Sequence, residues 1–330
     1  MASKIGLGID FGGTKLLGAI VDLETGKVLA TSKKKSSAAD SAKEVMERMY
    51  DLADATLKEG KLKASEIAGI GVGIAGQVDA AKGILLGTPN LSQAVVELPI
   101  VELLKKRYKV PAALRNDVQI AAVGEMAHGA GRGARSFLCC FVGTGVGGAI
   151  VEDGKLVSGA SGSAGEIGHL VIDAGGRLCG CGGSGHLEAY ASRTAITDTL
   201  LGHIKRGRPT ILRDLMPEIG EGEGGAAIRS GVLAKAVEAR DPLVTETIHD
   251  AGRYLGLGLA SVINLLNPGR IVLGGGVIEA VDLLFDIAVE HAMREALPTP
   301  ARFTEIVRAG LGDYSGVVGA ALLGAGARKK

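Results

Sequence analysis

Short apolar runs alternate with helical patterns along the first part of the chain. Ile5–Asp10 reads as a buried strand, and further strands are expected at Leu16–Asp22 and Val28–Lys34. The Thr25-Gly26 turn between the last two predicts a hairpin, because glycine between apolar runs favours a tight reversal. Apolar residues at helical spacing predict a helix within residues 40–60. The pattern then predicts a strand at Ile67–Ile74, a helix at 99–108, a strand at 110–115 and a helix at 118–128.

The opening pattern of strand, glycine turn and strand recurs once. Ser136–Val142 and Ala149–Glu152 are the second pair of strands, and the polar residues 205–230 are expected to form an exposed loop. A long helix over 241–266 ends at Asn267-Pro-Gly, which is a stop signal. A strand at Arg270–Leu273, a helix at 277–295 and a final apolar helix at Gly316–Gly326 complete the chain.

Composition narrows the class of protein. A chain of 330 residues is long enough for two domains, and 46% hydrophobic with 22% charged residues is typical of soluble globular proteins. The net charge of +1 provides no electrostatic attraction for nucleic acid or a membrane surface. No apolar run reaches the ~18 residues of a membrane span and no apolar signal region opens the chain, so we expect a cytoplasmic protein.

A glycine-rich loop carries four potential metal ligands. Cys179 and Cys181 are separated by one glycine, His169 lies ten residues before them and His186 five residues after. Two thiols and two imidazoles match the ligand types of a tetrahedral zinc site. The alternative is that the two cysteines lie in a glycine-rich loop by chance, and that alternative does not account for the two nearby histidines. We therefore predict zinc on His169, Cys179, Cys181 and His186. The adjacent Cys139 and Cys140 lie in an apolar run and are expected to be packing residues.

Two glycine–threonine turns, within Asp10–Lys15 and Gly143–Gly148, each join two strands. Neither has the Walker spacing, and neither precedes a helix as a dinucleotide fingerprint does. Glycine lets backbone N–H groups point at an anion, so the pair predicts a clamped nucleotide phosphate chain. Asp10 would hold Mg²⁺ through water, since hard cations prefer oxygen ligands. The predicted nucleotide-binding residues of these turns are Asp10, Gly12, Gly13, Thr14, Lys15, Gly143, Thr144 and Gly145.

Asn116-Asp117 ends a predicted strand and precedes a predicted helix. A carboxylate at a strand end could accept the proton of a substrate hydroxyl while a nucleotide gives up its γ-phosphoryl group. An Asn-Asp pair is also a common helix cap, and both roles can hold together. Glu166, His169 and Glu188 lie around the metal loop and could bind the hydroxyls of a sugar.

These motifs resemble the ROK family (repressor, ORF, kinase) of the actin/hexokinase superfamily. The resemblance runs from Ile5 to about Ala325 and includes, in the family's order, Asp10–Lys15, Gly143–Gly148, Gly165–His169, the Cys179/Cys181 loop and Leu187–Ser192. It implies an α/β fold of two actin-like (ribonuclease H-like) domains with a cleft between them. We expect a small domain of residues 1–117, completed by a helix at 316–330, and a large domain of residues 118–315 that contains the zinc loop.

The resemblance also implies an ATP-dependent hexose kinase that uses Mg²⁺, most closely one that converts glucose to glucose 6-phosphate, in a homodimer or homotetramer. Asp117 would then be the catalytic base, and Gly275 and Gly276 would lie at the adenosine. The implied sugar contacts are Gly76, Asn90, Asn116, Asp117, Glu166, His169 and Glu188. Zinc would shape the sugar pocket, with His186 where the family usually has a third cysteine.

Several alternatives stay open. After Thr88-Pro-Asn90-Leu91 the chain lacks the Pro-Gly-Trp of family glucokinases. The substrate could therefore be N-acetylmannosamine, N-acetylglucosamine, fructose, mannose, allose or a cyclitol, and the donor could be polyphosphate. A sugar-sensing repressor is disfavoured, because only four residues precede the first strand where repressors carry a helix-turn-helix. A non-catalytic actin-like scaffold is disfavoured because the base and the sugar-type residues are retained.

Overall fold

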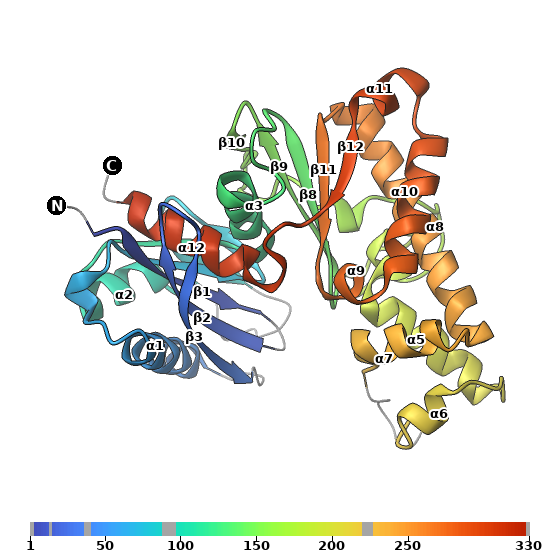
Figure 1. The fold of residues 1–330 in the computed structure, drawn as a ribbon, viewed down its shortest axis with the longest axis horizontal. Coiled ribbons are helices and arrows are strands. Elements are labelled where there is room, and N and C mark those ends of the chain that lie inside the picture. Colours follow the sequence, from blue (N-terminus) through green and yellow to red (C-terminus); the bar gives the residue numbers. More distant parts are fainter. Residues whose placement is uncertain (1–2, 13–14, 36–40, 88–96, 220–226, 328–330) are drawn as a thin grey trace. The chain divides into compact units, whose positions relative to one another are not determined.

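The computed structural model describes residues 3–12, 15–35, 41–87, 97–219 and 227–327, without the side chains of Lys15 and Lys35. The described chain is an α/β protein (Figure 1). It forms two compact units. Unit 1 comprises Met1–Cys139, Ala149–Gly165 and Ala309–Lys330, and unit 2 comprises Cys140–Gly148 and Glu166–Arg308. The expected division into domains at Asp117 stays a prediction.

The sheet of unit 1 has the strand order β3-β2-β1-β4-β7. The antiparallel side consists of β1 (Ile5–Phe11), β2 (Lys15–Asp22) and β3 (Val28–Lys35). On its other side β1 pairs in parallel with β4 (Ile70–Ile74), which pairs in parallel with β7 (Ala112–Asn116). A separate hairpin, β5 (Gln77–Asp79) with β6 (Ile84–Gly87), follows β4 and was not predicted from the sequence.

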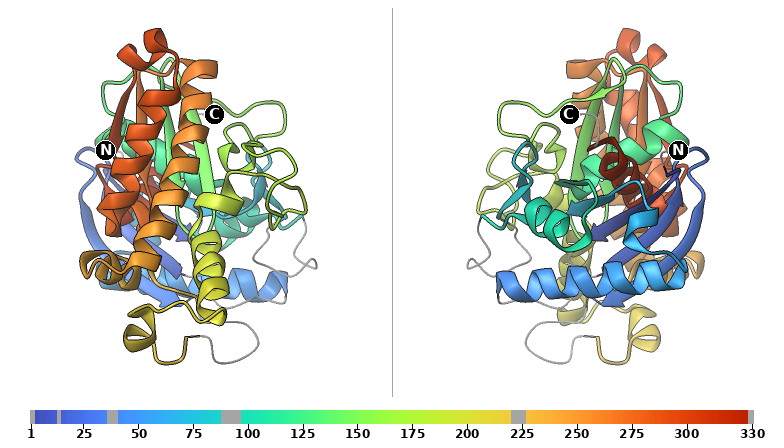
Figure 2. Two further views of the ribbon diagram at one scale, coloured as in Figure 1. Left: turned by 90° about the vertical axis from the view of Figure 1, so that its right-hand side faces the viewer. Right: turned by 90° about the vertical axis from the view of Figure 1, so that its left-hand side faces the viewer.

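Helices cover both faces of this sheet (Figures 1 and 2). The large apolar core lies against α1 (Ala42–Glu59) and α2 (Ile100–Tyr108), where the predicted apolar face of α1 is buried. On the other face α12 (Ser315–Gly326) crosses strands that present glycine. Side-chain carbons at Gly8 and Gly71 would collide with the carbonyl oxygens of Val317 and Ala320. The absence of side chains there lets the helix lie directly on the strands. The helix α3 (Asp117–His128) packs against α12.

The second sheet has the order β10-β9-β8-β11-β12. Its strands are β8 (Phe137–Val142), β9 (Val146–Glu152), β10 (Lys155–Leu156), β11 (Arg270–Gly274) and β12 (Glu305–Arg308). In unit 2 the long helices α8 (Pro242–Leu266) and α10 (Asp282–Glu295) lie side by side (Figure 2). The remaining short elements are η1 (Ala64–Glu66), η2 (Ile167–His169), α4 (Glu188–Ala191), α5 (Arg193–Lys205), α6 (Leu212–Leu215), α7 (Ser230–Glu238), α9 (Gly276–Ala280), α11 (Pro298–Phe303) and η3 (Gly312–Tyr314).

Local sequence signals were accurate where they set the ends of helices. The side chain of Asp241 accepts a hydrogen bond from the N–H of Val244, Pro242 opens α8, and Asn267 ends it in the left-handed conformation with φ 47°. Cys139 and Cys140 are buried, as predicted. Among the described residues no helix is long and apolar enough to cross a membrane.

Two predicted elements need correction. The single helix expected at 277–295 is divided into α9 and α10, because the buried Val281 has an extended backbone with φ −122° and ψ 90°. The expected exposed loop at 205–230 contains the helix α6, whose Leu212 is fully buried. In both places a buried side chain determines the local backbone. That burial is not evident from the polarity or the helical spacing of the neighbouring residues.

Candidate functional site

Three parallel strands of unit 1 end at one edge of its sheet. Phe11, Ile74 and Asn116 are register partners across β1, β4 and β7. The carboxyl ends of parallel strands form the usual ligand-binding edge of an α/β sheet. Gly12, Gly76 and Asp117 follow those ends, so the structure gathers predicted site residues from three distant segments.

Asn116 organises this edge. Its Oδ1 accepts hydrogen bonds from the N–H groups of Val118 at 2.9 Å and Gln119 at 3.4 Å, which confirms the predicted helix cap. Its Nδ2 donates to the carbonyl oxygen of Gly76 at 3.3 Å. One side chain therefore starts α3 and also joins it to the end of β4.

Asp117 is half-buried at the first position of α3. Desolvation raises the pKa of Asp117 above its ordinary value, against a smaller opposing effect of hydrogen bonds from the Val118 N–H and the Asn116 side chain. A carboxylate with a raised pKa is a better proton acceptor near neutral pH. This environment fits a general base, and that role stays a prediction.

The first glycine–threonine turn is described only in part. Asp10 lies beside the start of α12, since a side-chain carbon at Gly316 would be 2.8 Å from its Oδ2. Gly12 follows β1 directly. Gly13, Thr14 and the predicted sugar residue Asn90 lie outside the described residues, as does the side chain of Lys15.

In unit 2 the second glycine–threonine turn meets the predicted adenosine turn. The N–H of Gly143 donates to the carbonyl oxygen of Gly145 at 2.9 Å. Gly275 has φ 92°, and a side-chain carbon there would lie 2.7 Å from the backbone nitrogen of Val142, so only glycine fits this approach. Gly276 then begins α9. The fold thus brings together two turns for which the sequence predicts one ligand.

The side chain of Glu188 joins this turn to the metal loop. Its Oε2 accepts a hydrogen bond from the N–H of Val146 at 2.9 Å, and its Oε1 lies 3.8 Å from Sγ of Cys179. Glu166 is exposed and immediately precedes the short helix η2, which ends at His169. The predicted sugar contacts of Glu166, His169 and Glu188 stay predictions.

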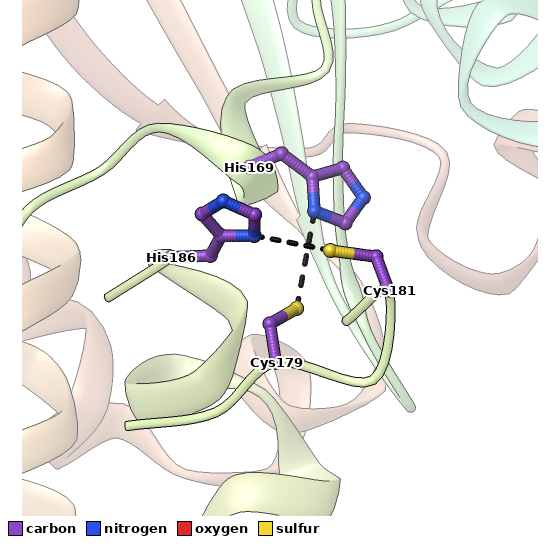
Figure 3. Close-up of side chains that lie close together, drawn as sticks. All are labelled: His169, Cys179, Cys181 and His186. Carbon is purple, nitrogen blue, oxygen red and sulfur yellow. Dashed lines mark hydrogen bonds between the residues drawn. The ribbon is translucent and has the colours of Figure 1, made fainter. Parts of the chain in front are cut away.

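The four predicted zinc ligands converge (Figure 3). One ligand atom from each of His169, Cys179, Cys181 and His186 lies within 4.8 Å of all the others. Sγ of Cys179 is 3.9 Å from Nδ1 of His169, and Sγ of Cys181 is 3.2 Å from Nδ1 of His186. Zinc bonds of about 2.0–2.3 Å in a tetrahedron place ligand atoms roughly 3.3–3.8 Å apart. The cluster fits zinc in ligand type and, after small adjustments, in spacing.

Hydrogen bonds within the metal loop and from Tyr190 to the preceding residues hold the loop in place. The N–H of Cys179 donates to the carbonyl oxygen of Gly183 at 2.7 Å. Behind the loop, the buried Tyr190 hydroxyl donates to Asp173 at 2.8 Å and accepts from the N–H of Arg177 at 2.7 Å. These contacts join the chain before Cys179 to α4 and close the loop between Cys179 and Gly183, so the protein's own hydrogen bonds organise the ligand positions.

Three polar residues with long-range hydrogen bonds were not predicted from the sequence. Gln119 and Glu125 on α3 are buried polar side chains with backbone partners far away in the sequence. Arg193, at the start of α5, donates to the Thr144 hydroxyl at 2.8 Å. Gln119 and Glu125 could have been found as polar residues within an apolar helix, whereas no sequence pattern indicates the role of Arg193.

The topology and the glycine turns define an α/β protein of the actin-like ATPase class, and whole-chain comparisons identify the family. A profile of the ROK family matches residues 6–326, and the chain belongs to this family. A glucokinase of Halalkalibacterium halodurans is 33% identical over 320 residues, which cover 97% of this chain and 94% of the relative.

Two solved structures are similar over nearly the whole chain. One is a ROK family glucokinase from Streptomyces griseus in complex with glucose and AMPPNP, with a TM-score of 0.81, 29% identity and coverage of 97% of this chain and 99% of that chain. The other is a ROK family transcriptional regulator, a homologue of the Escherichia coli Mlc protein. It has a TM-score of 0.82, 28% identity and coverage of 98% of this chain and 78% of that chain. The expected fold class is thereby confirmed.

Proposed function

We propose that this ROK protein is an ATP-dependent hexose kinase and that glucose is its substrate. The proposal rests on the desolvated Asp117 carboxylate, held beside Asn116 and Gly76 where three parallel strands end. The similar glucokinase structure carries glucose and an ATP analogue, and the H. halodurans relative has the same activity in its name.

In the proposed reaction Asp117 accepts the proton of the sugar hydroxyl. The hydroxyl oxygen forms a bond to the γ-phosphorus of ATP while the bond from that phosphorus to the β,γ-bridging oxygen breaks, and ADP leaves. The Gly143–Gly145 turn would bind the phosphates, and Gly275 and Gly276 would receive the adenosine. Asp10 would hold Mg²⁺, which would supply positive charge at the phosphates. Most of the rate enhancement then comes from positioning and charge stabilisation.

A panel of sugars tests this function. The wild-type protein is assayed for ADP release with ATP–Mg²⁺ and glucose, mannose, fructose, allose, N-acetylglucosamine or N-acetylmannosamine, and polyphosphate replaces ATP in a parallel series. We expect glucose with ATP to have the highest kcat/KM. Absence of sugar-dependent turnover above that of Asp117→Asn would overturn the proposal. Sugar binding without turnover would instead support the second candidate, a sugar-responsive regulator, which the TM-score of 0.82 to a ROK regulator favours.

We also propose that one zinc ion per chain is bound by His169, Cys179, Cys181 and His186, where it shapes the sugar pocket and takes no part in the chemistry. Elemental analysis of protein purified without added metal is expected to find near-stoichiometric zinc. His186→Ala should lower the zinc content, whereas His203→Ala on α5 should leave it unchanged. Zinc-free wild-type protein that still binds glucose would contradict the site. The oligomeric state, which we propose to be a homodimer, is measurable by light scattering of the same samples.

A further inference from the structure

A short loop of unit 1, Ser158–Gly165, leads directly into Glu166, one of the predicted sugar contacts. The N–H of Ala164 donates to the carbonyl oxygen of Ser158 at 3.2 Å and closes the loop. Gly162 has φ 86°, a left-handed conformation that favours glycine. The place where the chain reaches Glu166 therefore depends on how this loop is held.

The buried side chain of Gln119 holds the loop. Gln119 lies on the first turn of α3, three residues after Asn116, and is only 4% exposed. Its Nε2 donates to the carbonyl oxygen of Gly162 at 2.7 Å. A buried amide bonded to a distant backbone carbonyl fixes two segments to each other, because the amide would be left unpaired away from water without that partner.

Two further contacts reach the same loop. Nη1 of Arg115, the residue before Asn116, donates to the Ser158 hydroxyl at 3.3 Å. On another side, a side-chain carbon at Gly162 would lie 3.2 Å from the carbonyl oxygen of Val78 in β5. The loop thus packs between the end of β7 and the hairpin that follows Gly76.

Gln119 also belongs to a chain of hydrogen bonds that joins three segments. The Nδ2 of Asn116 donates to Gly76, the Oδ1 of Asn116 accepts from the N–H of Gln119, and the side chain of Gln119 donates to Gly162. Each segment carries or leads into a predicted sugar contact: Gly76, the pair Asn116 and Asp117, and Glu166. Polyhydroxyl ligands need several hydrogen bonds of fixed geometry, and buried supporting residues provide that geometry.

We propose that Gln119 is a positioning residue for the sugar, which acts by fixing the Ser158–Gly165 loop against the start of α3. The inference rests on the proposed kinase function. Gln119 itself touches no reacting atom. Its loss therefore weakens sugar binding and leaves the nucleotide turns in unit 2 unaffected.

The test compares the wild-type protein with Gln119→Met, which keeps the length and volume of the side chain but removes both polar groups. Thr197→Val is the matched control, since Thr197 is buried and its hydroxyl has no hydrogen-bond partner among the described residues. Hydrogen–deuterium exchange is measured on peptides covering residues 158–165, with peptides of β1 and β4 as internal references. Steady-state kinetics are measured with glucose and with ATP varied separately.

We expect exchange in residues 158–165 to be about tenfold faster in Gln119→Met, and the KM for glucose to rise about tenfold, as for the loss of one buried hydrogen bond. The KM for ATP should stay within about twofold, and Thr197→Val should match the wild type. Unchanged exchange in the loop, or equal increases in both KM values, would overturn the inference. If the wild type phosphorylates no hexose, the proposed function and the sugar role of Gln119 both fail, while the exchange comparison still decides whether Gln119 holds the loop.

Discussion

Two carboxylates on the same helix, the half-buried Asp117 and the fully buried Glu125 of α3, have opposite surroundings. Glu125 has no exposed surface and accepts four hydrogen bonds. The donors are the N–H groups of Ala130 at 2.7 Å, Gly310 at 2.8 Å and Leu311 at 3.0 Å, and the hydroxyl of Ser315 at 2.7 Å. Asp117 has fewer donors, and desolvation dominates its pKa.

The difference in hydrogen-bond donors distinguishes a carboxylate that stabilises the fold from one that can take part in the reaction. Four donors use the lone pairs of Glu125 and tie α3 to the chain that leads into α12, so this group stabilises the fold and has no capacity left for a ligand. Asp117 has fewer donors among the described residues, and its partial desolvation disfavours the charged form and makes it a better proton acceptor. Substitutions at the two positions should therefore affect different properties.

The largest effect is expected for Asp117→Asn. Amide for carboxylate keeps the shape of the side chain and removes the proton acceptor, so kcat should fall by ~10²–10⁴-fold while glucose affinity changes little. Steady-state kinetics and calorimetric titration with glucose measure the two quantities. Asp198→Asn, at an exposed position on α5, is the control. Turnover within a few-fold of wild type would exclude Asp117 as the base.

Glu125→Ala is expected to affect stability and not chemistry. It leaves buried donors without an acceptor, at a cost of roughly 1–3 kcal/mol each where water cannot replace the carboxylate, so the free energy of unfolding should fall by about 3 kcal/mol or more. Glu125→Gln should lose less, because one amide oxygen remains an acceptor. Urea denaturation measures the change, and Glu238→Ala, at an exposed position on α7, should stay within about 0.5 kcal/mol of wild type. A loss of under about 1 kcal/mol for Glu125→Ala would show that the contacts are not structurally important.

The sequence predicted the role of Asp117 in this comparison but did not predict the role of Glu125. Asn116 and Asp117 were identifiable because a strand end, a cap pair and a predicted helix are local patterns, and the zinc ligands because their types and spacing lie within 18 residues (169 to 186). Glu125 and Gln119 depend on partners 185 and 43 residues away, at Gly310 and Gly162. No local pattern encodes those distances.

The same limit applies to the fold. The long amphipathic helix α1 and the capped helix α8 carry their own signals, and the strands of unit 1 are apolar runs between turns. The two-residue β10 and the four-residue β12 are too short for a periodic pattern and exist because a neighbouring strand offers an edge. Tertiary pairing decides such elements.

A smaller effect should appear in the pH dependence of the reaction. Asp117 must be deprotonated to accept a proton, so kcat should fall as the pH is lowered through its pKa. Because desolvation raises that pKa, the acidic limb should lie above the ~3.9 of an ordinary aspartate. Rates with glucose and ATP–Mg²⁺ over the acid range, with circular dichroism as a check on folding, measure the limb. A midpoint at or below the ordinary value while the protein remains folded would contradict the desolvated environment.

The smallest expected effect is a gain in stability for Asp117→Asn, and it tests the contrast between Asp117 and Glu125 most sharply. A carboxyl whose pKa is higher in the folded than in the unfolded protein binds protons more tightly when folded. Its ionisation therefore opposes folding as the pH rises from the unfolded pKa, and this cost is complete above the folded pKa. Asp117→Asn removes the cost and keeps an oxygen for the Val118 N–H. At pH 7 the variant should unfold at a slightly higher temperature than wild type, and the difference should vanish below the ordinary aspartate pKa of ~3.9. Glu125→Gln leaves buried donors without an acceptor and should be less stable than the wild type at pH 7. A variant at position 117 that is less stable than wild type at neutral pH would mean that the carboxylate stabilises the folded state, as Glu125 does.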